Sequence, residues 1–150
     1  MGAPRELRSE IDIDASAERV WEVLTDFESL PEWNPFLRRA SGRVETGQRI
    51  EVVLQPPGRK ASTFRPTLLR VDPGRELRWL GRVGMPGLFD GEHVFRIEHR
   101  GPDRVHFVQE EFFRGLLRPF LGSLLRASER GFAAMNEALK SRAESGKPRP

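Results

Sequence analysis

The chain has 150 residues, with 25 lysines and arginines against 22 acidic residues, and it contains no cysteine. This length suits one domain with one continuous hydrophobic core. The lack of cysteine excludes disulfides, thiolate nucleophiles and cysteine-ligated zinc. The arginines alternate with acidic residues and do not form a basic stripe with interleaved aromatic residues, so we expect no nucleic-acid binding.

The two ends of the chain predict its compartment and its domain limits. The N-terminal residues lack the apolar segment of a signal peptide, and no segment approaches the roughly 20 apolar residues of a membrane span. We therefore expect a soluble, cytoplasmic protein with no integral membrane segment, either a monomer or a homodimer. Residues 141–150 are polar and rich in proline, which predicts a disordered tail after a single domain of residues 1–140.

The first part of the chain predicts a strand and two short helices. Alternating apolar and polar residues predict a strand over residues 7–14. Ser16 is a typical N-cap for the helix that follows. Asp26 is expected to cap a second helical piece, which Pro31 and Pro35 keep brief.

Strand patterns then continue as far as Phe113. Strands are predicted over residues 36–44, 48–55, 61–71, 76–83, 92–99 and 104–113. Short turn sequences separate them, which favours an antiparallel meander. The glycine-rich segment 81–91 is expected to be a loop, either an ordinary hairpin connection or a lid.

The last element differs in its period. Apolar residues recur about every 3.6 positions and predict one continuous helix over residues 116–140. The predicted fold is therefore α+β, with a curved antiparallel sheet of about six or seven strands wrapped around one long C-terminal helix. Because one rod does not fill a twisted sheet, we expect a cavity between them. Gly131 near the middle of this helix either lets a strand pack closely or leaves room for a guest.

The inward faces of the predicted elements supply the cavity walls. We expect these walls to include Ile50, Val52, Leu54, Trp79, Phe95, Phe107, Leu124, Ser128 and Phe132.

Three polar residues are expected on the same inward faces. Strand alternation places His93 beside Phe95 on one strand, and Gln109 and Glu111 beside Phe107 on the next. A hairpin would bring the three polar residues together in an otherwise apolar cavity. A carboxyl group beside an imidazole can act as an acid/base pair, with His93 and Glu111 as the catalytic groups. Equally, the cluster can orient the polar end of a ligand through hydrogen bonds.

No pattern in the chain predicts a metal or a cofactor. His93 and His99 share a strand face but lie six residues apart, and His106 points to the other face. The glycines of segment 81–87 are followed by no helix and so form no phosphate cradle.

Three segments carry a likeness to a known superfamily: residues 11–36 (IDIDASAERVWEVLTDFESLPEWNPF), 91–101 (GEHVFRIEHRG) and 105–117 (VHFVQEEFFRGLL). Together with the long terminal helix, they resemble the START-like helix-grip superfamily, also called SRPBCC. Within it the likeness is strongest to the bacterial polyketide cyclase/dehydrase and lipid-transport group, over about residues 7–140. The resemblance implies a cavity between sheet and helix, with the second short helix at its mouth. There Trp33 would act as a gate or as a packing wedge, and Asn34 would offer a polar contact.

The resemblance implies no single reaction, because members include lipid carriers, hormone receptors and cyclases. Our leading interpretation is binding or carrying of a hydrophobic small molecule, either a lipid or a polyketide-like compound. The alternative is an aromatase/cyclase-like or dehydratase-like enzyme that uses His93 and Glu111, and a protein-interaction module is a third possibility. The first two need the same pocket, so the sequence does not decide whether the protein is an enzyme.

Overall fold

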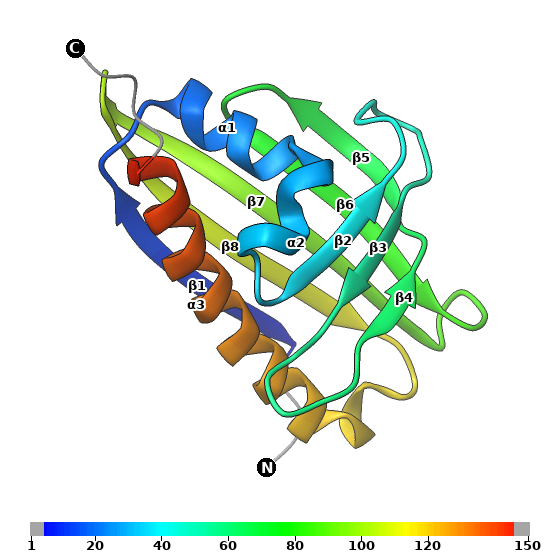
Figure 1. Cartoon of the computed structure of the whole chain (residues 1–150). Coiled ribbons are helices and arrows are strands. Elements are labelled where there is room, and N and C mark those ends of the chain that lie inside the picture. Colours follow the sequence, from blue (N-terminus) through cyan, green and yellow to red (C-terminus); the bar gives the residue numbers. More distant parts are fainter. Residues whose placement is uncertain (1–4, 146–150) are drawn as a thin grey trace.

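The structure is a computed structural model that describes residues 5–145 (Figure 1). Its elements in chain order are β1 (Glu6–Ile13), α1 (Ala17–Thr25), the 3-10 helix η1 (Phe27–Ser29), α2 (Leu30–Trp33), β2 (Leu37–Ser41), β3 (Glu51–Leu54), β4 (Ser62–Phe64), β5 (Thr67–Asp72), β6 (Glu76–Val83), β7 (Phe89–Gly101), β8 (Arg104–Arg114), the 3-10 helix η2 (Arg118–Phe120) and α3 (Gly122–Ser145). As predicted, Ser16 caps α1, because its Oγ accepts a hydrogen bond of 3.1 Å from the backbone N–H of Arg19.

The strands form two antiparallel sheets. One has five strands in the order β1-β8-β7-β6-β5, and the other has three in the order β2-β3-β4. Figure 1 shows α3 running along the inner side of the larger sheet, next to β1, while α1, α2 and the smaller sheet lie over the rest of that side. This arrangement confirms the predicted α+β helix-grip fold.

The predicted single strand over residues 61–71 is two strands in different sheets. β4 pairs with β3, whereas β5 pairs with β6. Pro66 lies between β4 and β5 and has no backbone N–H to donate to a sheet ladder, so the strand breaks there. The curvature therefore comes from a change of sheet and not from one continuous meander.

The predicted loop over residues 81–91 is mostly strand. β6 ends at Val83, where the predicted strand over residues 76–83 ends, whereas β7 begins at Phe89, and these two residues pair with each other. Only residues 84–88 connect the two strands. The glycines that suggested a loop include Gly81 and Gly91, which also pair across the hairpin.

The long helix is shifted relative to its prediction. It begins at Gly122 because the chain first turns at Gly115 and forms η2, which contains Pro119. At the other end, buried Ala143 and the Lys140–Glu144 ion pair of 2.6 Å extend the helix through residues 141–145, which were predicted to be part of a tail. The rest of that predicted tail, residues 146–150, lies outside the described residues.

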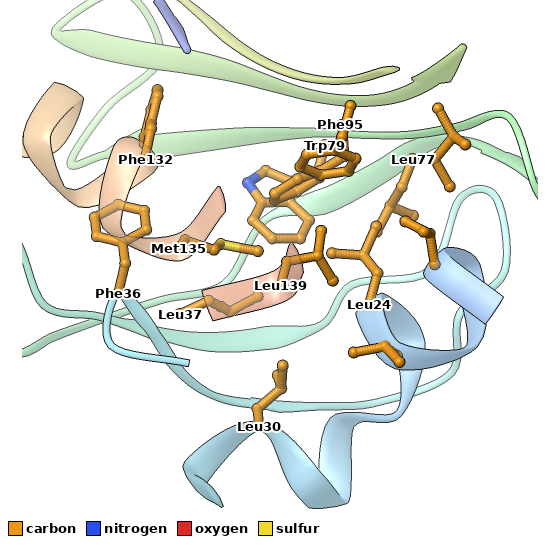
Figure 2. Close-up of a cluster of buried hydrophobic side chains, with 14 of the residues drawn as sticks. Leu24, Leu30, Phe36, Leu37, Leu77, Trp79, Phe95, Phe132, Met135 and Leu139 are labelled. Carbon is orange, nitrogen blue, oxygen red and sulfur yellow. The ribbon is translucent and has the colours of Figure 1, made fainter. Parts of the chain in front are cut away.

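The core lies between the larger sheet and the helices (Figure 2). Gly131 of α3 is buried against Phe36, whose ring atoms a β carbon at this position would hit. The Phe36 ring in turn contacts Phe132 edge to face, with 5.4 Å between the ring centroids. Of the two roles considered for Gly131, the structure therefore supports close packing.

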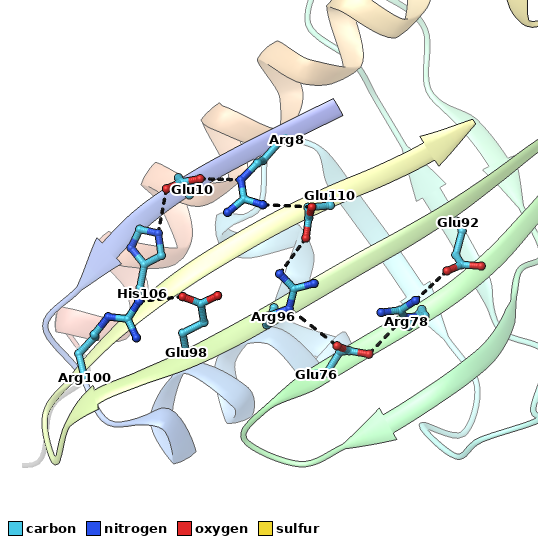
Figure 3. Close-up of polar contacts among 10 residues, drawn as sticks. All are labelled: Arg8, Glu10, Glu76, Arg78, Glu92, Arg96, Glu98, Arg100, His106 and Glu110. Atoms are coloured by element: carbon cyan, nitrogen blue, oxygen red, sulfur yellow. Dashed lines mark hydrogen bonds and ion pairs between the residues drawn. The ribbon is translucent and has the colours of Figure 1, made fainter. Parts of the chain in front are cut away.

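Ion pairs cover the outer face of the larger sheet (Figure 3). Glu110 is nearly buried there, but its carboxylate accepts hydrogen bonds from Arg8 at 3.1 Å and forms an ion pair with Arg96 at 2.8 Å. Glu110 and His106 therefore face outward, and β8 has the register that puts Gln109 and Glu111 on the inner face.

His106 makes two contacts on this outer face. Its Nδ1 lies 2.7 Å from the Asp12 carboxylate and its Nε2 lies 3.1 Å from the Glu10 carboxylate. The hydrogen bond with Asp12, aided by Glu10, raises the pKa of His106 above its ordinary 6.5. The hydrogen bond from His106 lowers the pKa of Asp12 below its ordinary 3.8. A hydrogen bond from Arg8, followed by that from His106, lowers the pKa of Glu10 below its ordinary 4.5.

The stability of the protein should therefore depend on pH through His106. Its contribution is fully present below pH 6.5 and is lost as the pH rises through the raised folded-state pKa. The contributions of Asp12 and Glu10 to stability are present above pH 3.8 and pH 4.5, respectively, and are lost as the pH falls through their lowered folded-state pKa values. Urea unfolding should show the largest difference between the unaltered protein and His106→Gln between pH 4.5 and 6.5, with a smaller one near pH ~9. His99→Gln is the control, and a difference that stays constant up to pH ~9 would contradict the prediction.

Among residues 5–145, no helix has the length and apolar composition that crossing a membrane requires.

Candidate functional site

A cavity of about 280 Å³ lies between the N-terminal half of α3, the smaller sheet and strands β6 to β8. Most of its wall is apolar, and it opens where Arg59, Lys60 and Val83 reach the surface. The lining residues are Phe36, Val52, Leu54, Pro56, Arg59, Lys60, Ser62, Phe64, Pro66, Trp79, Gly81, Val83, Phe89, Gly91, Glu111, Phe113, Leu124, Leu125 and Ser128.

The structure divides the predicted wall residues into two groups. Those that line the cavity are Val52, Leu54, Trp79, Glu111, Leu124 and Ser128. Those that are buried in the core away from the cavity are Ile50, Phe95, Phe107 and Phe132. The division arises because the helices and their side chains fill one end of the space inside the sheet, so the cavity is left at the other end.

Sequence reasoning missed several wall residues that strand alternation could have found. Phe113 shares the inward face of β8 with Glu111, and Gly81 shares that of β6 with Trp79. Alternation puts both residues inward, but Gly81 also falls in the segment 81–91 expected to be a loop, and the expected walls did not include Phe113. Phe36 and Phe64 were also missed: Phe36 immediately precedes β2, and Phe64 ends β4 next to the change of sheet at Pro66.

Two glycines that face each other shape the floor of the cavity. A β carbon at Gly81 would meet nothing nearer than 3.9 Å, so a side chain there would extend into open space. A β carbon at Gly91 would lie 2.7 Å from Oε2 of Glu111. Gly81 therefore keeps the cavity open, and Gly91 makes room for the Glu111 carboxylate.

The predicted polar cluster exists and continues into the core. His93 and Glu111 are paired residues on β7 and β8, and His93 Nδ1 lies 3.6 Å from Glu111 Oε1. On the other side of the imidazole, Nε2 lies 3.0 Å from Oε1 of Gln109. Gln109 Nε2 donates hydrogen bonds to Asn136 Oδ1 at 2.6 Å and to the backbone carbonyl of Phe132 at 3.3 Å.

This chain of hydrogen bonds assigns the proton on His93. The Phe132 carbonyl can only accept, so the amide nitrogen of Gln109 faces α3 and its oxygen faces the imidazole. His93 Nε2 therefore carries a hydrogen and donates it to Gln109. His93 Nδ1 is buried without a hydrogen-bond partner, because 3.6 Å to Glu111 is too long for one. A proton between Nδ1 and Glu111 would complete the chain.

His93 and Glu111 differ in their access to the cavity. Glu111 is on the wall, whereas His93 is fully buried behind it and stacks on Phe95, with 4.2 Å between the ring centroids. Gln109 is also fully buried away from the wall. Of the three predicted polar residues, only Glu111 lines the cavity, and His93 lies behind it.

Trp33 and Asn34 do not line the cavity. Asn34 is buried, and its Oδ1 accepts hydrogen bonds from the backbone N–H groups of Phe36 at 3.0 Å and Leu37 at 2.9 Å. It therefore shapes the turn between α2 and β2. Trp33 is half-buried and packs against the core, as the wedge role requires.

Within the part of the chain that the structure describes, no three His, Asp or Glu side chains are placed to hold a metal ion.

The fold and the cavity together define a helix-grip protein, in which a curved antiparallel sheet and one long C-terminal helix enclose a space. The sequence pattern of the family described as "Polyketide cyclase / dehydrase and lipid transport" matches residues 4–144. The chain belongs to this family. No curated protein sequence matches the chain.

Several solved structures share the fold. A START superfamily protein from Mycobacterium smegmatis has a TM-score of 0.74 at 17% identity, with 96% of this chain and 100% of that chain covered. The Zhui aromatase/cyclase from Streptomyces sp. R1128 has a TM-score of 0.75 at 20% identity, with 93% of each chain covered. A point mutant of norcoclaurine synthase from Thalictrum flavum has a TM-score of 0.71 at 16% identity, with 99% of each chain covered. The family supports a ligand-binding or cyclase-type function, and these structures show the fold.

Proposed function

We propose that the protein binds or carries a hydrophobic small molecule, a lipid or a polyketide-like compound, in the cavity beside Glu111. The observation that carries this proposal is a space of about 280 Å³ with a largely apolar wall. Ligand pockets are typically apolar with a few placed polar groups and have volumes of about 300–1,000 Å³. A compact ligand is therefore favoured over a long-chain lipid that would have to lie wholly inside.

The wall suggests how such a ligand would lie. Trp79, Phe89 and Phe113 offer aromatic surface to its apolar body. Glu111 is the only acidic residue among the described wall residues, and its carboxylate can accept a hydrogen bond from a hydroxyl of the ligand. Ser128 Oγ donates its hydrogen to the Leu124 carbonyl at 3.0 Å and so also offers acceptor lone pairs.

An enzyme with a cyclase- or dehydratase-like reaction is the second candidate, and the Glu111–His93 pair favours it. The 3.6 Å between Glu111 Oε1 and His93 Nδ1 would let a proton pass between them after a small movement. Glu111 would exchange a proton with the substrate, and His93 would supply or hold that proton from behind the wall. The pair would thus act as one acid/base group that contacts the substrate only through Glu111.

Glu111→Gln should separate these two functions. An environment-sensitive apolar dye should bind the unaltered protein one to one and be displaced by fatty acids or polyaromatic compounds. If the protein is a carrier, the substitution should lower the affinity for hydroxyl-bearing ligands by about 3–10-fold, because one hydrogen bond contributes about 0.5–1.5 kcal/mol. If it is an enzyme, the rate should fall about 10²-fold with binding largely kept.

Glu98→Gln, on the outer face of the larger sheet, is the matched control and should leave dye binding and displacement unchanged. Native mass spectrometry of gently purified protein would show whether a ligand accompanies it. If no apolar dye binds to the folded protein, the proposed function is wrong.

A further inference from the structure

Large apolar side chains are exposed on two neighbouring connections. Met85, between β6 and β7, is 74% exposed, and Leu116 and Phe120, between β8 and α3, are 78% and 82% exposed. Single exposed apolar residues are common on protein surfaces, but a group of large ones on adjacent segments indicates a binding surface. We refer to Met85, Leu116, Leu117 and Phe120 as the apolar patch.

The backbone holds the two connections together. The N–H of Leu116 donates to the Gly87 carbonyl at 3.2 Å, and the N–H of Leu117 donates to the Leu88 carbonyl at 3.0 Å. Gly115 has a φ of +122°, and a β carbon there would collide with the Leu88 backbone. The patch is therefore built from segments that are fixed to each other.

The segments that carry and adjoin the patch are strongly basic. Residues 83–89 and 112–128 include Arg114, Arg118 and Arg126 but no aspartate or glutamate, whereas Arg82 is paired with Asp90 at 3.7 Å. Residues 55–62 at the cavity rim add Arg59 and Lys60, again without an acidic residue. Two such surfaces would repel each other, so the charge favours an anionic partner over a second copy of this chain.

We propose that the apolar patch docks onto the surface of an anionic lipid bilayer. Exposed apolar side chains with arginines beside them match the two layers of that surface, because the side chains enter the acyl boundary and the guanidinium groups meet the lipid phosphates. Phe120 and Leu116 protrude into solvent, so a bilayer accepts them without a complementary pocket.

Docking places the cavity opening at the bilayer. Val83 lines the cavity and is also 41% exposed, next to the β6–β7 connection that carries Met85. Phe89, Phe113 and Leu124, at the ends of the same connections, are wall residues. The inference goes beyond the proposed function, because docking requires no ligand, but it indicates the direction from which an apolar ligand would enter.

Cosedimentation with vesicles tests the proposal. The full chain should bind vesicles of equal parts phosphatidylcholine and phosphatidylglycerol at low salt, and should bind vesicles of pure phosphatidylcholine at least about tenfold more weakly. The double variant Leu116→Ser/Phe120→Ser should lose about tenfold or more in affinity for the anionic vesicles. The double variant Arg114→Gln/Arg126→Gln should bind more weakly and with less dependence on salt. Leu69→Ser, which alters an apolar residue of β5 that is 39% exposed, is the matched control and should bind normally.

Two further measurements complete the test. Gly81→Leu, which fills the cavity, should bind the vesicles normally, so a failure of docking is distinguishable from a failure of ligand binding. The proposal is overturned if the chain does not bind anionic vesicles, or if the Leu116→Ser/Phe120→Ser variant binds them normally. Ultracentrifugation that shows a dimer in the unaltered protein and a monomer in that variant would assign the patch to a second copy instead.

Discussion

Replacing Gly131 with alanine should lower the free energy of unfolding by about 1–3 kcal/mol, although alanine is the better helix former. A β carbon at this position would lie 2.8 Å from Cε1 of Phe36 and nearer still to Cδ1. Both residues are buried, so the ring cannot move without disturbing its contact with Phe132. The cost of overpacking should exceed the helix propensity gain of about 1 kcal/mol. Urea unfolding measures the difference.

Gly122→Ala in the same helix is the matched control. A β carbon there would meet only the end of the flexible Arg126 side chain, so this variant should be neutral or slightly more stable. In a protein that already carries Phe36→Leu, Gly131→Ala should lower the free energy of unfolding by less than it does in the unaltered protein. A double-mutant cycle of these variants gives the coupling energy between the two positions. Equal stability of Gly131→Ala and the unaltered protein would refute the packing role.

Replacing Gly81 with leucine should abolish most ligand binding and at the same time stabilise the protein. The new side chain would extend into the cavity of about 280 Å³ with no atom nearer than 3.9 Å to its β carbon. The affinity for an apolar dye should fall at least about tenfold, which corresponds to about 1.4 kcal/mol. Because the cavity is filled and a strand glycine is removed, the free energy of unfolding should rise by about 0.5–2 kcal/mol.

The opposite signs of these two effects make the test specific, because general damage to the fold would lower both quantities. Leu80→Val, which alters the neighbouring residue on the opposite face of β6, should leave dye binding unchanged. If Gly81→Leu binds the dye as well as the unaltered protein does, the ligand does not occupy this cavity.

Local alternation and helical period determined the fold class and the inward face of the strands. The period of two on β7 and β8 correctly placed His93, Gln109 and Glu111 inside and His106 outside, because a shift of one residue would have turned the apolar residues to solvent. The helical period predicted α3 despite a difference of six residues at its start and five at its end. Helix ends depend on contacts such as that of Gly115 with Leu88, which the period does not contain.

The cavity was decided only by the tertiary structure. The sequence predicted that a cavity exists, but in the structure Phe95, Phe107 and Phe132 lie in the core, whereas Phe64 and Phe89 line the cavity. The reason is that the change of sheet at Pro66 and the position of α3 determine which inward residues meet packing partners. Likewise, alternation placed His93 and Glu111 side by side, but only packing decided that Glu111 reaches the cavity and His93 lies behind it. Periodicity specifies the direction of a side chain relative to its own strand, whereas the space in front of it depends on distant segments.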